Sequence, residues 1–430
     1  MSLSRFLERN ASAALLVIGV IWSGFAHAMP GFARQYELSC NVCHAAVPRL
    51  NAFGQQFADE LNMRLPNWKE KTVSGGDELL ALPRQFPVGI RAQAFVQVRE
   101  GEDIDPLTGP TGNDSDFDFQ APYLIKLITS APLSDHITFY AYGIFAEKGE
   151  NGTVLIEDAW FSHDNLFGTG ISAQLGQFQI SDVMFPREVR LTFQDFQVYR
   201  MAGVTYDRGV LFGRGFGPVD IDIGAVNGNG INDSVNIDSP GFRRPDRLFD
   251  RDDDKSIFGR IGTRLGLVSA GLFGLSGKQR SAAGLAGELS GARNTDRRVY
   301  GIDVSGQRGA NLFWFGQVLW NEWDDFLDSA PGRDFEWWGG FLGLDYVRND
   351  RWAFSLLYNY NDAGDFKGTQ TVFEGIEMNT LTLGASYYFM RNVKAVIELN
   401  VDFLSRDRDP DFVGHETREH YFLIGFDAAF

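Results

Sequence analysis

The 430-residue chain contains only two cysteines, Cys40 and Cys43, so a framework of several disulfides is excluded. No apolar run reaches the roughly 20 residues that a membrane-spanning helix requires. Basic residues are also scarce, and the net charge is −17. Because binding to phosphate backbones needs a basic face, we expect no nucleic-acid partner.

The first 28 residues have the pattern of a secretory signal peptide. Arg5 and Arg9 precede a short apolar stretch at 13–25, and Ala26-His27-Ala28 supplies small residues for cleavage. The stretch is too short for a spanning helix. We therefore predict that residues 1–28 are removed and that the mature chain is exported. Many aromatic residues and 48 glycines then favour strands over helices in the mature chain.

The run Cys40-Asn41-Val42-Cys43-His44 is the C-x-x-C-H pattern of c-type haem attachment. Two thiols at this spacing can add to the two vinyl groups of one porphyrin, and the adjacent imidazole can then bind the iron. A redox-active disulfide pair and chance are the alternatives. We predict one covalently bound c-type haem, with His44 as proximal iron ligand, in a cytochrome segment at 29–85.

A helix is expected at 52–65 within this segment. Asn51 is a plausible N-cap, the apolar residues Phe53, Phe57 and Leu61 repeat every four positions, and Pro66 ends the helix. We interpret the apolar stripe as packing against the haem. The sixth iron ligand is left open by the sequence: Met63 is nearest in the chain, and the other candidates are His136, His163, His415 and His420.

From residue 86 onward the chain alternates in the way that membrane strands do. In 393–403, Val393, Ala395 and Ile397 share one face, whereas Lys394 and Glu398 share the other. We expect lipid on the apolar face and a wet lumen on the charged one. Sixteen candidate strands begin near residues 88, 123, 136, 154, 170, 197, 219, 258, 268, 298, 312, 336, 352, 378, 393 and 421.

Long connections alternate with tight turns along these strands, as in outer-membrane barrels with short periplasmic turns and long external loops. The chain also ends in alternating apolar residues that run to Phe430. We therefore predict an all-β fold, a 16-stranded antiparallel transmembrane β-barrel at 86–430 in the bacterial outer membrane, in contact with its lipid. Interfacial girdles are expected at Trp314, Trp320, Trp323, Trp337, Trp338 and Trp352.

Charged residues suggest two further features. Acidic loops near 102–118, 250–254 and 407–411 offer oxygen ligands that suit hard cations, although external loops are commonly acidic for solubility alone. Lumen charges that could select permeants are Arg91, Arg99, Arg260, Arg264, Asp220 and Asp222.

The segments 32–35, 39–44 and 48–57, together with 176–191, resemble the fused outer-membrane cytochrome–porins of iron-oxidising bacteria. The resemblance covers essentially the whole mature chain, although 58–61 departs from the basic, glycine-bearing continuation of that family. It implies that Cys40, Cys43 and His44 bind haem, that the partly helical N-terminal segment plugs the barrel, and that electrons come from Fe(II) outside.

Two functions are expected from these features. In the first, the haem takes electrons from extracellular Fe(II), or another one-electron donor, and passes them to a periplasmic c-type cytochrome. Such an iron-oxidising cytochrome would need no catalytic acid or base, because the haem carries the chemistry. In the second, the chain is a solute-specific porin whose haem segment only gates or senses.

Overall fold

The computed structural model describes residues 31–67, 72–74, 76, 81–83, 87–100, 102–105, 109–114, 117–147, 150–228, 230–231, 254–284, 291–390, 392–404 and 420–429. The predicted signal peptide, His415 and the acidic residues of 250–253 and 407–411 lie outside the described residues. Among the described helices, none combines the length and the apolar character needed to cross a membrane.

Sixteen antiparallel strands close into a barrel, which confirms the predicted fold class. The last strand, β22, pairs with the first, β5, so the barrel has no free edge. The strands are β5 (Val88–Glu100), β8 (Asp118–Pro132), β9 (Ile137–Glu147), β10 (Glu150–His163), β11 (Ser172–Gln179), β12 (Tyr206–Phe216), β13 (Val219–Val226), β14 (Ser256–Leu265), β15 (Val268–Arg280), β16 (Asn294–Arg308), β17 (Leu312–Trp323), β18 (Phe335–Val347), β19 (Trp352–Asp362), β20 (Met378–Met390), β21 (Val393–Asp402) and β22 (His420–Ala429).

Side chains alternate between the lumen and the outside along each strand. On β21, Lys394 and Glu398 are buried inside the barrel, whereas Ile397 is 44% exposed on the outside. The outer surface carries many exposed apolar side chains, including Ile257, Leu272, Ile302 and Leu342. An apolar outer belt on a closed barrel is what lipid requires, because every backbone polar group is paired within the wall. The protein is therefore an outer-membrane β-barrel.

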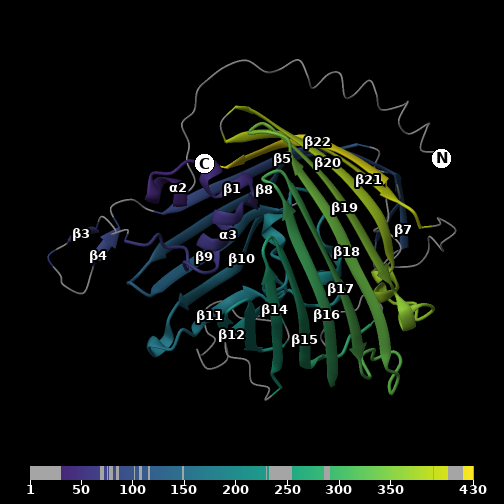
Figure 1. The fold of residues 1–430 in the computed structure, drawn as a ribbon. Helices are drawn as coiled ribbons and strands as arrows, with labels where there is room; N and C mark the ends of the chain where they lie inside the picture. Colours follow the sequence, from purple (N-terminus) through teal and green to yellow (C-terminus); the bar gives the residue numbers. More distant parts are fainter. Residues whose placement is uncertain are drawn as a thin grey trace.

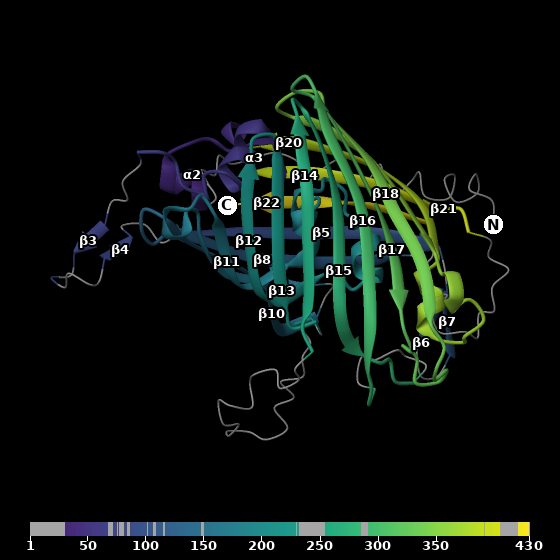
Figure 2. The same cartoon turned by 60° about the horizontal axis from the view of Figure 1, so that its bottom comes forward.

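The two ends of the barrel differ as expected. The turns at one end are short, as at 133–136, 217–218 and 266–267, and most connections at the other end are long, with the exception of the one between β9 and β10. We name these the turn end and the loop end. By the usual arrangement of such barrels, the turn end faces the periplasm. Figures 1 and 2 show α2 and α3 of the N-terminal segment at one end and the hairpin of β6 (Glu102–Asp105) and β7 (Gly109–Asp114) toward the other.

One expected strand start is wrong. The alternation predicts a sixth strand near residue 197, but β12 begins at Tyr206, and 197–201 form the short helix α4 (Gln197–Met201). The apolar residues that suggest a strand, Val198 and Tyr199, are each 1% exposed within the lumen. Burial inside the barrel, rather than contact with lipid, explains their apolar character.

This helix belongs to a long connection, 180–205, which we call the infolded segment. It also contains η3 (Ile180–Val183) and η4 (Arg187–Val189). Glu188 lies 3.1 Å from Lys126 on β8, Asn359 on β19 donates to the Asp195 carbonyl at 3.1 Å, and Arg297 on β16 donates to the Gly203 carbonyl at 3.1 Å. Because these strands lie around the circumference, the segment crosses the lumen.

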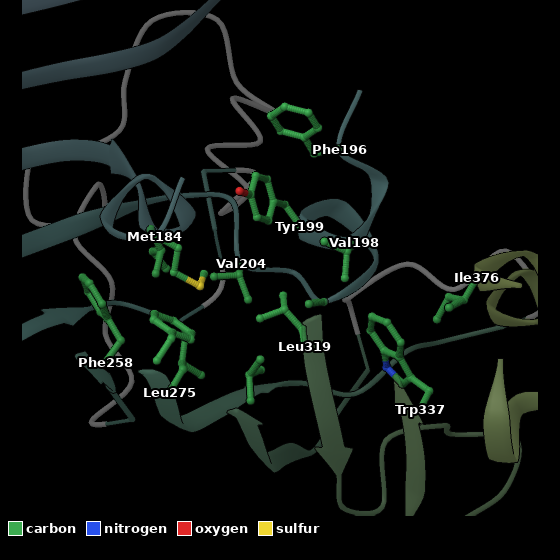
Figure 3. Packing of buried hydrophobic residues seen from close by; sticks show 14 of the residues in the cluster. Met184, Phe196, Val198, Tyr199, Val204, Phe258, Leu275, Leu319, Trp337 and Ile376 are labelled. Atoms are coloured by element: carbon green, nitrogen blue, oxygen red, sulfur yellow. The ribbon is translucent and has the colours of Figure 1, made fainter. Parts of the chain in front are cut away.

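The infolded segment packs on one side against apolar side chains of the wall (Figure 3). Phe196 stacks on Phe341 of β18 with a centroid distance of 4.4 Å, and Phe185 stacks on Phe315 of β17 at 4.5 Å. The expectation of a wet lumen is therefore wrong for this side of the barrel. Inward-facing aromatic residues of the wall, such as Phe258 of β14, Phe273 of β15, Phe315 of β17 and Phe341 of β18, meet other parts of the chain instead of water.

The alternation of side chains between lumen and outer surface confirms some of the predicted girdle tryptophans and corrects others. Trp320, Trp338 and Trp352 are between 37% and 42% exposed on the outer surface, as expected for interfacial residues. Trp323 and Trp337 are each 3% exposed and belong to the lumen cluster. Their strand positions place them on the inward face, next to the connection that contains η6 (Gly364–Phe366) and η7 (Val372–Ile376).

The N-terminal elements precede the barrel wall. They are α2 (Gly31–Tyr36), η1 (Cys40–Val42), β1 (His44–Ala46), β2 (Arg49–Leu50), α3 (Ala52–Ala58), β3 (Thr72–Ser74) and β4 (Ala81–Pro83). The predicted N-cap is confirmed, since Asn51 Oδ1 accepts from the Gly54 amide at 2.9 Å. The predicted extent of the helix, to residue 65, is wrong, because α3 ends at Ala58. The chain reverses there, with left-handed φ values of +48° at Asn62 and +56° at Met63.

Candidate functional site

The two cysteines lie on a tight turn that α3 holds in place. The Cys43 amide donates to the Cys40 carbonyl at 3.2 Å, and Asn51 Nδ2 donates to the Val42 carbonyl at 2.9 Å. Gly54 comes so close that a Cβ atom there would lie 2.0 Å from the Cys43 carbonyl oxygen. Only glycine permits this approach of the helix to the turn. Asn51 and Gly54 thus fix the C-x-x-C backbone.

His44 follows directly on β1 and has a defined ring orientation. Its Nδ1 lies 3.1 Å from the Pro48 carbonyl, a contact that orients the ring by donation from Nδ1–H and leaves Nε2 as the acceptor nitrogen. Metal-binding imidazoles usually have this arrangement, in which the other ring nitrogen donates to a carbonyl. Burial lowers the pKa of the His44 imidazole, which favours the neutral form that a metal needs.

The thiols are compatible with the same use. Cys40 and Cys43 are both free and partly exposed, and burial raises the pKa of each thiol. The donor set of two unbridged thiols and one oriented imidazole fits a c-type haem, which Cys40, Cys43 and His44 would hold. Among the described residues, no group of three or more His, Cys, Asp or Glu side chains could hold a bare metal ion.

The core of the N-terminal segment is small and aromatic. Phe57 of α3 is 6% exposed and meets Phe32 and Tyr36 of α2 edge to face, each at 5.5 Å. Phe53 remains partly exposed, and Leu61 falls beyond the end of the helix. The three residues of the predicted apolar stripe therefore do not share one packed face. Of the three, Phe57 is the one that packs α3 against α2.

Residues 47–63 contact the wall of the barrel at several separate strands of the turn end. Lys394 on β21 donates to the Val47 carbonyl at 2.7 Å, and Thr138 on β9 donates to the Asn62 carbonyl at 2.8 Å. Glu60 lies 3.3 Å from Arg264 on β14. The segment thus contacts strands on different sides of the turn-end opening.

Arg49 makes the most buried of these contacts, and sequence reasoning does not predict it. Its side chain is 3% exposed and forms an ion pair with Asp345 of β18, whose side chain is 2% exposed, with Nε at 2.7 Å from Oδ2. The guanidinium lies over Phe315 at 4.7 Å and over Phe185 of the infolded segment at 5.3 Å. The sequence shows only an arginine shortly after the C-x-x-C-H motif, and its partner lies 296 positions away.

The candidates for the sixth ligand are spread over the molecule. Met63 Sδ lies 3.8 Å from Ser130 Oγ on β8, so this side chain turns toward the wall. His163 shares its strand face with the exposed Phe161, and its ring stacks on that of His136 at 5.5 Å, which places this pair on the outer surface. His420 begins β22 at the loop end. Met63 as distal ligand remains a prediction.

Several predicted lumen charges are paired. Arg91 lies 2.8 Å from Asp427, and Arg260 bridges Asp220 and Asp303 at 2.8 Å each. The infolded segment adds Arg187, Glu188, Arg190 and Asp195 to the charged residues of the lumen, and Arg187 lies 3.0 Å from Asp195. Both charge signs are present among these residues, so neither sign dominates in a way that would select anions or cations. The side chain of Arg99 lies outside the described residues.

Comparison with solved structures shows the same fold in porins. The chain is similar to the outer membrane channel DcaP of Acinetobacter baumannii, with a TM-score of 0.53 at 12% identity over 80% of this chain and 96% of that one. It is also similar to OmpF of Salmonella typhi in complex with daunomycin, with a TM-score of 0.52 at 11% identity over 80% and 98%. No family model matches the chain, and no curated protein matches it. What these comparisons share with the chain is the architecture of an outer-membrane porin barrel.

Proposed function

We propose that the protein is an outer-membrane electron carrier with one c-type haem, bound through Cys40, Cys43 and His44, in a segment that plugs the turn end of the barrel. The observation that carries the proposal is the imidazole of His44, which is oriented by the Pro48 carbonyl and directly follows two unbridged thiols. The haem would supply reversible one-electron chemistry at iron.

The placement of the segment supports a route for the electron. The turn end faces the periplasm by the usual orientation of such barrels, so a periplasmic c-type cytochrome is the natural acceptor. An extracellular donor, Fe(II) or another one-electron reductant, lies at the opposite end. The infolded segment lies between them, with its charged residues Glu188 and Arg190 partly exposed in the lumen.

The test uses the full chain purified from membranes after expression with a haem-attachment system. We expect a pyridine haemochrome spectrum of a c-type haem, and rapid reduction of the haem by Fe(II) near neutral pH in stopped-flow absorbance. The matched control replaces both Cys40 and Cys43 by Ala and should lose the covalent haem while the barrel still folds. A wild-type protein without haem would refute the proposal, and a haem that Fe(II) never reduces would refute the iron donor.

A solute-specific porin whose haem segment gates or senses is the second candidate. The similarity of the barrel to a channel of known structure favours it. The two candidates differ in ion flow. An electron carrier whose N-terminal segment plugs the lumen permanently should show little conductance in planar bilayers as the full chain at any applied voltage. A gated porin should show opening and closing of the full-length channel.

A further inference from the structure

We propose that Arg49 is the positioning residue that seats the haem segment in the barrel, by joining His44 to the wall and to the infolded segment at once. This inference rests on the proposed function, because it concerns the placement of the proposed axial ligand. Arg49 immediately follows Pro48, whose carbonyl orients the imidazole, and β1 pairs with β2 so that His44 lies opposite Leu50. A shift of Arg49 therefore shifts His44.

The Arg49–Asp345 ion pair is more deeply buried than the other ion pairs between the N-terminal segment and the wall. Among the described residues, Arg264–Glu60 joins two side chains that are 51% and 56% exposed, and Arg64–Asp135 includes an aspartate that is 95% exposed. Exposed pairs of this kind contribute little, because water competes for both charges. Arg49 and Asp345 are almost wholly buried, so loss of either partner leaves an uncompensated charge away from water.

The geometry also needs arginine rather than any cation. Two guanidinium nitrogens, Nε and Nη2, donate to Asp345 Oδ2, while the guanidinium carbon lies over the ring of Phe315. Lysine would keep the positive charge, but it has only one side-chain nitrogen, so it could not donate from two nitrogens to Asp345 and lie over Phe315 at the same time. The contact with Phe185 extends the same side chain to the infolded segment. Arg49 thus connects three parts of the fold.

The experiment compares the full haem-loaded protein with Arg49→Gln, Arg49→Lys and Asp345→Asn variants. Arg264→Gln is the matched control, because it also removes an arginine that pairs with the N-terminal segment. The first readout is the rate of cleavage by chymotrypsin at Phe53 and Phe57, which all variants retain. We expect cleavage to be on the order of a hundredfold faster in Arg49→Gln and Asp345→Asn, because a buried charge has lost its partner.

The second readout is the reduction potential of the haem. Unseating exposes the iron to water, which stabilises its more highly charged oxidised form, so the potential should fall in Arg49→Gln and fall less in Arg49→Lys. A loss of packing elsewhere in the protein would not produce this order of reduction potentials among the variants. Equal cleavage rates in Arg49→Gln and Arg264→Gln would overturn the inference, provided that heat-modifiable mobility on gels shows each barrel to be folded. Absence of haem in every variant would instead refute the proposed function, and the cleavage comparison would still test the seating.

Discussion

Replacement of Glu398 by Ala should release the infolded segment from the wall. Glu398 lies on β21 with no exposed surface, and its two carboxylate oxygens accept from the backbone amides of Phe193 at 2.6 Å and Gln194 at 2.9 Å. The Tyr421 hydroxyl donates to the same carboxylate at 2.7 Å but belongs to the wall. Two consecutive amides of the connection therefore depend on one buried side chain.

The size of the effect follows from these contacts. A hydrogen bond to a charged group contributes about 1.5–3 kcal/mol, and two such bonds hold the segment. Neighbouring contacts are not additive, and water can enter the space left by Ala, so we expect a loss of about 3 kcal/mol in the free energy of local opening. Since about 1.4 kcal/mol corresponds to tenfold, the open population should rise roughly a hundredfold.

Amide hydrogen exchange of the barrel in detergent micelles measures this local opening. Peptides covering 190–204 should exchange roughly a hundredfold faster in Glu398→Ala, while peptides of the wall strands keep their protection. Thr382→Ala is the matched control, because Thr382 is also fully buried on the wall and donates only to Asn400 of the neighbouring strand, at 2.8 Å. Equal exchange in the two variants would refute the idea that Glu398 anchors the segment.

Three further outcomes are expected. Gly54→Ala should sharply reduce the yield of covalent haem, measured by pyridine haemochrome, because its Cβ would collide with the Cys43 carbonyl; Gln55→Ala on the exposed side of α3 should have little effect. His44→Ala should leave the covalent haem attached through Cys40 and Cys43 but change its optical spectrum, because one axial ligand is lost. Burial raises the pKa of Asp182 in the infolded segment to about 7 from 3.8, so the stability of its docking should be greatest below 3.8, should fall as pH rises, and should level off above 7. Hydrogen exchange at 190–204 should thus accelerate between about pH 5 and 7 after correction for intrinsic rates, and Asp182→Asn should reduce that dependence.

Two carboxylates that neighbour Asp182 do not titrate in this pH range. Its neighbour Glu188 keeps a pKa below its usual value, since Lys126, Arg187 and Arg190 outweigh the effect of burial. The pKa of Asp195 is likewise held at about 2 by arginines, chiefly Arg190 and Arg187, against the effect of burial. Both carboxylates therefore stay ionised throughout the range, and among these three groups only Asp182 changes its charge.

Local patterns in the chain are enough to predict nearly all of the sixteen strands, the alternation of their faces and the alternation of short and long connections. Within a strand the pattern repeats every two residues, and along the chain a tight turn occurs at every second connection. No distant contact is needed to recognise either feature. The N-cap at Asn51 is equally local, because the side chain bonds an amide three residues away. The C-x-x-C-H motif carries its chemical meaning in five consecutive residues.

The contents of the barrel, by contrast, depend on contacts between distant parts of the chain. An apolar residue has the same character whether it meets lipid or another part of the protein, so the sequence alone does not show that Tyr199 and Trp337 pack against other segments inside the barrel. The partners of Arg49 and Glu398 lie 296 and about 200 positions away, and closure of the barrel brings them together. The two-residue periodicity of a strand predicts the face on which a side chain lies. Packing inside the lumen depends on contacts between distant residues, which no local pattern predicts.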